Sequence, residues 1–398
     1  MAEASKRREV WITGVGLISS LGTDPADHKK YSETGNGRAV DEARYAPYPV
    51  HPLVSLDWSK QIPKNSDQRQ METWQRIGVY AAGLALADAG ITGKPELLER
   101  TNLLVAAGSG ERDTKVDCDV LEAMRPDDET APLAKRVLPG ALRPTLFLAQ
   151  LSNMLAGNIS IVHHVTGSSR TFMGEESGAF AAAENAFRRI SAGQADMILV
   201  GGALNAERED LLLGYEIGHN LWRGPFKPTR ERGGEGGGFI PGSVGAFLVL
   251  ESRTHAEARG AKAYARLTDV VTDYTARMEG DVSRAMTRLF ERVLPHVPAG
   301  TLPVWSGASG VEPAMSEELT FLDVLPTCDI TPDLHVYGDG IGYSVEAHFF
   351  AGLALAALAT KNAAQCDACG TNTAANRALV TGTGYWRGEA LALIEAIG

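Results

Sequence analysis

The chain has 398 residues, of which 44% are hydrophobic and 22% charged, and this balance excludes a largely disordered protein. A single core seldom grows beyond about 250–300 residues, so we expect two packed halves. The formal net charge of −11 repels nucleic acid and acidic proteins. We therefore expect no nucleic-acid binding, and a local basic patch wherever an acidic partner docks.

Strand-like and helical segments alternate along the first part of the chain. Short apolar runs bounded by glycine indicate buried strands, and apolar residues at helical spacing indicate helices. The alternation predicts an α/β fold around a mostly parallel, buried sheet. The expected elements are a strand at 9–16, a helix at 71–89, strands at 103–110 and 158–165, a helix at 178–192, and strands at 197–202 and 246–251.

A second series of strand-like and helical segments follows, and it is similar in length to the first. Two successive series predict two related halves, residues 1–253 and 254–398. The expected elements of the second series are a strand at 262–271, a helix at 282–293, a strand at 302–306, a buried helix at 344–361, and closing strands at 378–381 and 390–396.

The cysteines and the apolar segments predict no disulfide framework, no metal site and no membrane span. Cys366 and Cys369 form one C-x-x-C pair in an expected surface loop, and no second pair supplies the other two ligands of a structural zinc site. The N-terminal segment lacks the apolar core of a secretory signal, and the apolar run at 349–360 is too short to cross a bilayer. We expect a reduced, cytoplasmic protein.

Glycine is dense between Arg223 and Gly245, which lets the backbone approach a ligand or itself closely. The segment has no Walker-type spacing, and Gly14-Val-Gly16 lacks the third glycine of a dinucleotide-binding turn. We expect no nucleotide and no other cofactor.

Several segments resemble β-ketoacyl-acyl-carrier-protein synthases. RGPFKPTRERGGEGGGF at 223–239 resembles the mid-chain signature of that family. VWITGVGLISSLG at 10–22, LALADAGI at 84–91 and AGQADMILVGGA at 192–203 resemble further family segments in the same order. The resemblance covers nearly the whole chain. It implies a thiolase-like fold, in which two related α/β halves form five αβαβα layers and the protein assembles as a dimer.

The resemblance also gives the positions of the catalytic residues. In the family, a cysteine at a helix N-terminus takes the acyl group as a thioester, two histidines stabilise the enolate formed by decarboxylation, and a lysine supports the electrostatics. The corresponding residues of this chain are Glu176 for the cysteine, Gly307 and Asp339 for the histidines, and Leu334 for the lysine. Thr383 occupies the position of the gating-loop phenylalanine.

These replacements predict that the chain has no catalytic residue of the family type. A carboxylate is a poor acyl carrier because its acyl product is a labile anhydride, and its charge opposes a developing enolate. Loss of a nucleophile alone costs on the order of 10⁶ in rate in triad enzymes. We therefore expect no condensing activity from this chain alone.

The other histidines are interpreted as structural. His163 and His164 are expected on a strand, one pointing inward and one outward. His348 is expected to be a hydrogen-bonded core residue of the buried helix. His335 lies near the turn that contains Asp339, and we expect it to be structural because no partner for it is evident.

The leading hypothesis is a non-catalytic subunit that resembles the chain-length factors, which pair with an active ketosynthase. This resemblance implies a heterodimer and an acyl carrier protein as partners. RTFMGEES at 170–177 and VGGALNAEREDLLL at 200–213 resemble a ketosynthase homologue of α-proteobacterial clusters that make very long acyl chains for lipid A.

Two alternatives remain open. A homodimeric enzyme would use Glu176 as a general base in acyl-thioester hydrolysis or decarboxylation, or Glu176 and Asp339 as an acid–base pair. A homodimeric scaffold would bind acyl carrier protein without turnover. Arg69 and Arg76 lie on the helical surface where the family docks its carrier, and they are equally interpreted as carrier-docking residues or as solvated surface arginines.

Overall fold

The computed structural model describes residues 7–35, 37–124, 138–141, 144–366 and 376–397. Within these residues the strands form one continuous sheet in the order β3-β2-β4-β5-β1-β6-β10-β9-β7-β8. The strands are β1 (Val10–Ile18), β2 (Asn102–Ala106), β3 (Ser169–Phe172), β4 (Met197–Leu204), β5 (Val244–Ser252), β6 (Ala265–Asp273), β7 (Gly300–Ser306), β8 (Ile330–Val336), β9 (Arg377–Thr383) and β10 (Glu389–Glu395).

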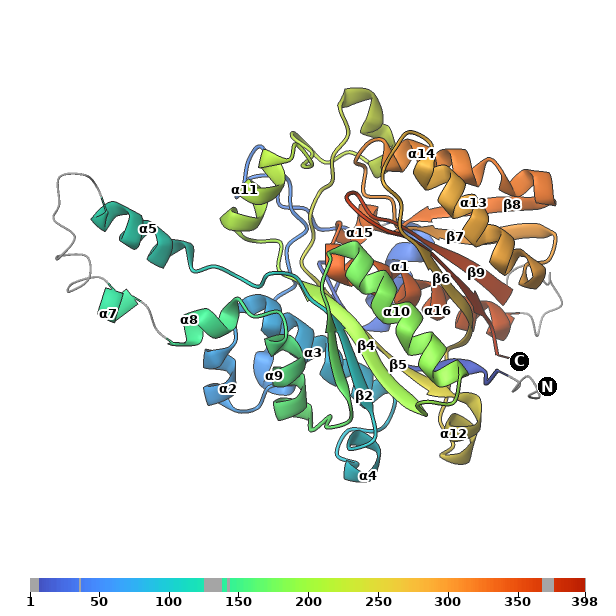
Figure 1. Cartoon of the computed structure of the whole chain (residues 1–398), viewed down its shortest axis with the longest axis horizontal. Helices are drawn as coiled ribbons and strands as arrows, with labels where there is room; N and C mark the ends of the chain where they lie inside the picture. Colours follow the sequence, from blue (N-terminus) through green and yellow to red (C-terminus); the bar gives the residue numbers. More distant parts are fainter. Residues whose placement is uncertain (1–6, 36, 125–137, 142–143, 367–375, 398) are drawn as a thin grey trace.

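Helices cover the sheet on its outer faces and also fill the space between its two groups of strands (Figure 1). The α-helices are α1 (Pro25–Thr34), α2 (Asn65–Gln70), α3 (Thr73–Asp88), α4 (Pro95–Leu98), α5 (Thr114–Ala123), α7 (Leu138–Ala141), α8 (Pro144–Ala149), α9 (Met154–His163), α10 (Glu176–Ser191), α11 (Glu209–Ile217), α12 (Arg253–Ala258), α13 (Asp281–Val293), α14 (Ala314–Leu322), α15 (Gly338–Ile341) and α16 (His348–Cys366).

The apolar clusters between the helices and the strands define five layers. α10 and α16 form the middle layer, and their apolar residues pack against the inner faces of both groups of strands, β1–β5 and β6–β10. α3 and α9 cover the outer face of the first group. α13 and α14 cover the outer face of the second group. The result is the αβαβα architecture that the resemblance implied.

The expectation of a mostly parallel sheet is wrong. Antiparallel pairs join β4, β5, β1, β6, β10 and β9 through the middle of the sheet. The parallel pairs lie toward the two ends, where β2 pairs with β3 and β4, and β7 pairs with β8 and β9. A strand buried on both faces is apolar in either direction, so composition does not reveal that residues 384–388 turn β9 straight back into β10.

The predicted strand at 158–165 is also wrong, because these residues belong mostly to α9. A short apolar run does not distinguish a buried strand from a buried helix. The buried positions Leu155 and Ile159 are four residues apart and face α3, which is a helical spacing. His163 and His164 therefore do not alternate across a strand: the His163 ring lies 2.8 Å from the carbonyl oxygen of Val79, and His164 ends the helix in the left-handed conformation.

Few residue pairs connect the two groups of strands. β1 and β6 pair only over Val10–Ile12 and Ala265–Leu267. The strands β1–β5 all end before residue 253, and β6–β10 all begin after it. We therefore propose residues 1–253 and 254–398 as the two halves.

The C-x-x-C pair lies at the edge of what the structure describes. Cys366 is the last residue of α16, and Cys369 lies outside the described residues. In the described part of the chain, no three His, Cys, Asp or Glu side chains are arranged to hold a metal ion. Each helix among the described residues lacks the length or the apolarity needed to cross a membrane.

α3 packs unusually close to β1, and this contact requires glycine. A Cβ atom built at Gly16 would lie 2.0 Å from the carbonyl oxygen of Ala81, and one at Gly14 would lie 2.4 Å from that of Ala85. These distances are far below van der Waals contact, so β1 and α3 would have to separate to admit a methyl group.

We expect Gly16→Ala to lower the free energy of unfolding by about 1–3 kcal/mol, the usual cost of overpacking a core. The measurement is the urea midpoint of the purified chain. Gly234→Ala is the matched control, because a Cβ atom there meets no other atom within 4 Å. Equal midpoints for the two variants would contradict the close packing of α3 on β1.

Candidate functional site

A strained turn presents the first residue of α10 to the interior. β3 ends at Phe172, and Gly174 and Glu175 then adopt φ angles of 129° and 54°. A positive φ is costly for a residue with a side chain, so the surrounding structure must hold Glu175 in place. The turn directs the side chain of Glu176 into the protein, where it is 1% exposed.

Glu176 is held in a form that is unsuited to nucleophilic chemistry. Its Oε1 accepts a hydrogen bond from the Tyr343 hydroxyl at 2.5 Å and another from the backbone N–H of Tyr385 at 3.0 Å. Burial, and secondarily the nearby carboxylate of Glu175, raise the pKa of Glu176 to about 8, although the hydrogen bond from Tyr343 acts in the opposite direction. At neutral pH the side chain is therefore mostly an uncharged acid.

A closed cavity of about 10 Å³ lies beside Glu176. This volume is close to the minimum for one water molecule. Three of the five family positions, Glu176, Gly307 and Thr383, meet at this cavity. Its remaining lining residues are Phe180, Tyr337, Tyr343, Val345, His348, Phe349 and Gly382.

Gly307 has no room for a larger side chain. It follows β7, and its N–H donates to the Thr381 hydroxyl at 3.1 Å. A Cβ atom at Gly307 would lie 2.6 Å from the carbonyl oxygen of Thr381 and 2.8 Å from the Tyr337 hydroxyl. Tyr337 therefore occupies the space that a histidine at position 307 would need.

Asp339 and Leu334 do not reach the cavity. Asp339 lies in α15, and its Oδ1 accepts hydrogen bonds from the backbone N–H and the hydroxyl of Thr229 at 2.8 and 2.6 Å. Arg232 Nη2 lies 3.7 Å from the same oxygen. Leu334 lies on β8 and packs against the apolar cluster beneath α13 and α14. Asp339 thus anchors the glycine-rich segment, and the structure does not bring it to Glu176.

The sequence did not reveal the aromatic residues that surround the cavity beside Glu176. Tyr337 and Tyr343 flank His348, each with its ring centroid 4.4 Å from the imidazole. Burial lowers the pKa of His348 to about 3, so its ring is neutral. In the sequence, the two tyrosines stand on either side of the Gly338–Gly342 turn, which contains Asp339. Two aromatic residues this close to a candidate site residue were the available sign that rings fill this region. His335 instead stacks on Trp305 at 5.0 Å.

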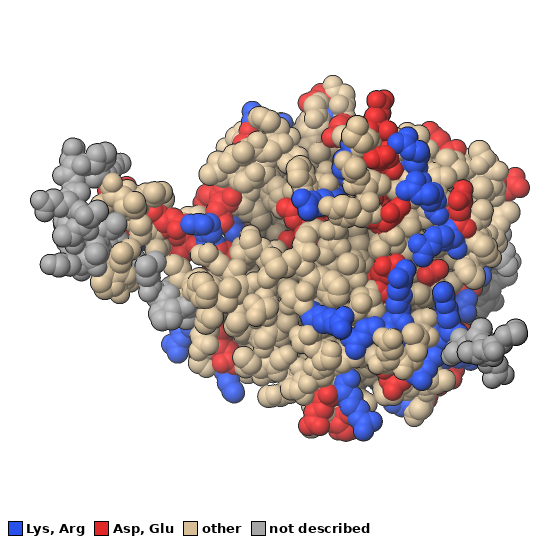
Figure 2. All heavy atoms as spheres, viewed as in Figure 1, with Lys and Arg blue, Asp and Glu red and all other residues tan. Residues whose placement is uncertain are grey.

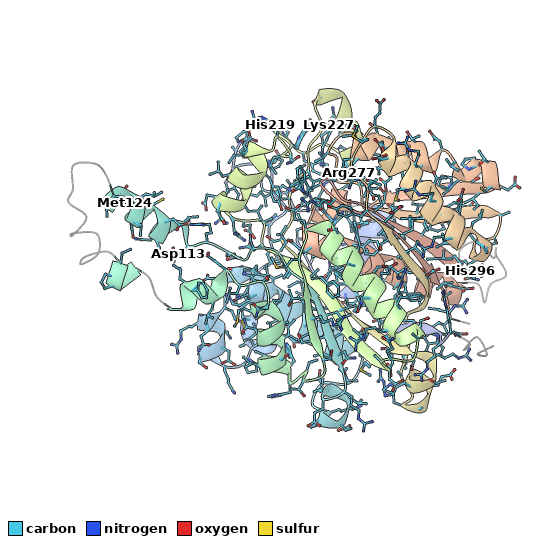
Figure 3. The ribbon with its side chains drawn as sticks, viewed as in Figure 1. Asp113, Met124, His219, Lys227, Arg277 and His296 are labelled. Atoms are coloured by element: carbon cyan, nitrogen blue, oxygen red, sulfur yellow. The ribbon has the colours of Figure 1, made fainter. Side chains whose placement is uncertain are left out.

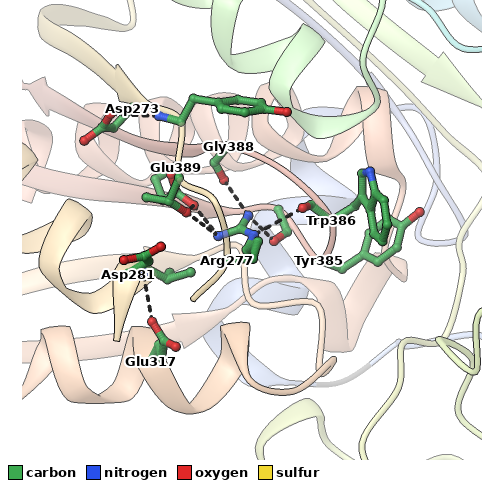
Figure 4. A network of polar contacts seen from close by, with 12 residues as sticks. Asp273, Arg277, Asp281, Glu317, Tyr385, Trp386, Gly388 and Glu389 are labelled. Atoms are coloured by element: carbon green, nitrogen blue, oxygen red, sulfur yellow. Dashed lines mark hydrogen bonds and ion pairs between the residues drawn. The ribbon is translucent and has the colours of Figure 1, made fainter. Parts of the chain in front are cut away.

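The loop at 384–388, which follows the gating position Thr383, is held by contacts on two sides. Tyr385 bonds inward to Glu176 through its N–H and to Glu175 through its hydroxyl, the latter at 3.2 Å. Outside, Arg277 forms an ion pair with Glu389 (Figure 4). Its guanidinium also donates to three carbonyl oxygens of the loop, at Gly384 (2.8 Å), Trp386 (3.2 Å) and Gly388 (3.2 Å). The loop is therefore closed over Glu176.

A larger cleft of about 600 Å³ lies on the other side of this closure. Glu175, Glu346 and Tyr385 line it, together with Tyr215 on α11, and burial raises the pKa of Glu346 to about 7. In the described residues, the cleft and the small cavity share no lining residue. Glu175 lines the cleft and its neighbour Glu176 lines the cavity, so the two spaces lie on either side of this part of the chain.

The two candidate carrier-docking residues lie in one surface hollow of about 430 Å³. Arg69 is in the last turn of α2, and Arg76 is on α3. The Arg76 guanidinium lies 5.4 Å from the Trp58 ring centroid and donates to the Thr73 hydroxyl at 3.2 Å. The structure therefore brings both arginines together.

We expect Glu176→Gln to change how stability depends on pH. The folded-state pKa of Glu176 is raised, so its contribution to stability is complete below its ordinary value of 4.5 and is lost as pH rises toward about 8. One pKa unit corresponds to about 1.4 kcal/mol. By pH 8 the free energy of unfolding of Glu176→Gln should therefore be higher than that of the wild type by on the order of a few kcal/mol.

Urea midpoints at pH 5 to 9 measure this difference. Glu99→Gln makes the same chemical change at an exposed position and should follow the wild type. Parallel curves for Glu176→Gln and the wild type would mean that Glu176 is ionised in the folded protein.

We expect Arg277→Ala to loosen the closure without unfolding the chain. The variant loses the three carbonyl contacts, so the amides of residues 384–388 should exchange hydrogen faster by at least about tenfold if opening becomes 1.4 kcal/mol easier. Arg284→Ala removes an exposed arginine that pairs with Asp281 and serves as the control. Unchanged exchange in Arg277→Ala would show that the inner contacts alone hold the loop.

Comparisons with known proteins agree with this geometry. Residues 54–256 match the family described as "Beta-ketoacyl synthase, N-terminal domain". The 3-oxoacyl-[acyl-carrier-protein] synthase 2 of Rhizobium meliloti (strain 1021) is 28% identical over 284 residues, 65% of this chain and 63% of the relative. The enzyme of the same name from Vibrio cholerae is 27% identical over 271 residues, 66% of this chain and 62% of the relative. The matches thus span less than two thirds of these curated relatives.

Solved structures show the same fold. "The ishigamide ketosynthase/chain length factor" matches with a TM-score of 0.79 at 19% identity, covering 98% of this chain and 100% of the other. A type II polyketide acyl-carrier protein in complex with its ketosynthase matches with a TM-score of 0.75 at 18% identity and the same coverage. The thiolase-like α/β fold is confirmed, and the chain belongs to the β-ketoacyl synthase family.

Proposed function

We propose that the chain is a non-catalytic, chain-length-factor-type subunit that pairs with an active β-ketoacyl-acyl-carrier-protein synthase in fatty acid elongation. One observation carries the proposal: the position of the catalytic nucleophile holds a buried carboxyl beside a cavity of about 10 Å³. This space suits about one water molecule, so a thioester carbonyl with its flanking carbons does not fit in the cavity as it stands. The chain therefore has neither the nucleophile nor the space for condensation.

The edge of the first group of strands supports pairing with another chain. Within the described residues, β3 pairs with β2 on one side only. An unpaired edge strand beside apolar side chains is a template for association. Ile161 on α9 and Met173 after β3 are 61% and 65% exposed. Figure 2 shows a broad area with few charged side chains over α9 and the neighbouring strands.

α5 gives independent support. It stands away from the body of the protein, and Figure 3 places Asp113 at its base and Met124 at its far end. No residue of α5 is buried, although Leu121 and Met124 are large and apolar. A helix without a buried residue gains little from its own chain, so a second chain is the natural source of its packing.

The partners proposed are an active ketosynthase and an acyl carrier protein. One similar structure is titled a ketosynthase/chain length factor, and another contains an acyl-carrier protein bound to its ketosynthase. Carrier proteins are acidic, so Arg69 and Arg76 in their shared hollow are the proposed carrier contact on an otherwise acidic chain.

We also propose very-long-chain acyl synthesis for lipid A as the setting. This finer assignment rests on the segments 170–177 and 200–213, which resemble the corresponding homologue of α-proteobacterial clusters. Within these segments, Met173 and Leu213 are both more than half exposed, so they are available to a partner surface.

Hydrolysis by Glu176 is the second candidate. Among the described residues, Glu176 Oε2 has no protein partner, which favours hydrolysis because a general base needs a free oxygen. The pKa of about 8 opposes it at neutral pH, because the carboxyl is then mostly protonated. The closed loop 384–388 opposes it, because a thioester and an attacking water would both have to enter. Thioester turnover by the chain alone, lost in Glu176→Gln, would replace the subunit proposal.

The test of the proposal is co-purification with the neighbouring intact ketosynthase of the source genome. We expect a one-to-one complex by mass in solution that elongates a malonyl-loaded carrier, while this chain alone does nothing. Ile161→Glu should weaken the complex at least tenfold, because it places a charge on the apolar edge. Met278→Glu, an equally exposed apolar position in the second half, is the matched control.

A stable homodimer that ignores the ketosynthase would overturn the subunit proposal. If that homodimer retains acyl carrier protein without turnover, the chain is a carrier-binding scaffold.

A further inference from the structure

Four buried polar atoms around the closed cavity lack a protein hydrogen-bond partner in the described residues. They are Glu176 Oε2, Tyr337 Oη, His348 Nε2 and Thr383 Oγ1, and all four residues line the cavity. Buried polar groups in native proteins are nearly always hydrogen-bonded to protein or to ordered water. Four such atoms around one enclosed space therefore point to an occupant of that space.

We infer that the cavity binds one water molecule, held by Glu176, Tyr337, His348 and Thr383. The volume of about 10 Å³ is close to the space that one water molecule needs. A buried water typically makes two to four hydrogen bonds, which is the number of partners that the cavity offers. The inference goes beyond the proposed function and does not depend on the identity of the partner subunit.

The hydrogen-bond donors facing the cavity select water over a small cation. His348 Nδ1 lies 3.4 Å from the backbone N–H of Ser344 and accepts from it, so the ring proton is on Nε2, which donates into the cavity. Glu176 Oε1 already accepts two hydrogen bonds, so a proton on the neutral acid lies on Oε2 and also points inward. A cation would face two donated protons.

One water molecule gives each of the four groups a hydrogen bond. It accepts the protons of His348 Nε2–H and Glu176 Oε2–H, and it donates its own two to the oxygens of Thr383 and Tyr337. The pKa of Glu176 is raised and that of His348 is lowered by burial, which keeps both groups in the neutral forms that this arrangement requires. The former catalytic centre thereby becomes a closed, uncharged hydrogen-bonded cluster.

The sign of a stability change distinguishes a hydrated cavity from a dry one. If the hydroxyls bind water, Thr383→Val and Tyr337→Phe each remove a hydrogen bond and should lower the urea midpoint. If the cavity is dry, each change replaces an unsatisfied buried hydroxyl by an apolar group, and the midpoint should rise or stay the same. Thr360→Val is the control, because that buried hydroxyl donates to the carbonyl of Ala356 and lies outside the cavity.

A crystal structure of the full-length wild type gives the second readout, and it stands even if a variant does not fold. We expect one spherical peak within hydrogen-bond distance of at least three of the four atoms. An empty cavity, a larger occupant, or unchanged or higher midpoints in both variants would overturn the inference.

Discussion

The packing at the start of α10 depends on one buried acid, Glu176. Its Oε1 accepts from the Tyr343 hydroxyl and from the backbone of Tyr385, which are 167 and 209 positions away along the chain. The first turn of α10, the turn after α15 and the β9–β10 hairpin therefore meet at a single oxygen atom. Any ligand would have to separate these three segments before it reached the N-terminus of α10, so the contact that stabilises the fold also restricts access to Glu176.

The other substitutions in the centre are consistent with this closure. Tyr337 occupies the volume left by the glycine at 307, and His348 lies between two tyrosine rings as a neutral imidazole. Arg277 holds the hairpin from outside through the loop carbonyls. Together these contacts fill the space around Glu176 with aromatic rings and hydrogen-bond donors. By contrast, within the described residues β3 pairs on one side only and no residue of α5 is buried, so these two features carry the proposed contact with another chain.

The sequence was sufficient for the family, because segments around α10 and β4 carry the resemblance, and it placed Glu176 close to the start of the helix that the structure shows at Glu176–Ser191. It was insufficient for α9, where an apolar run suits a helix as well as a strand, and for strand direction, which depends on connections rather than on composition. It also placed Asp339 by its flanking glycines, yet the side chain bonds to Thr229, 110 positions earlier. The cluster of Tyr337, Tyr343 and His348 was missed because ring stacking depends on side-chain directions that spacing does not give.

The backbone at Gly307 limits which side chains can enter the cavity beside Glu176. A Cβ atom at this position would lie 2.6 Å from the carbonyl oxygen of Thr381 and 2.8 Å from the Tyr337 hydroxyl. A histidine at position 307 therefore requires both a smaller residue at position 337 and a shift of the β9 backbone. A smaller residue at position 337 by itself removes an aromatic neighbour of His348 and leaves a void. Either change alone lowers stability, so Gly307 and Tyr337 are expected to change only together in the evolution of this chain.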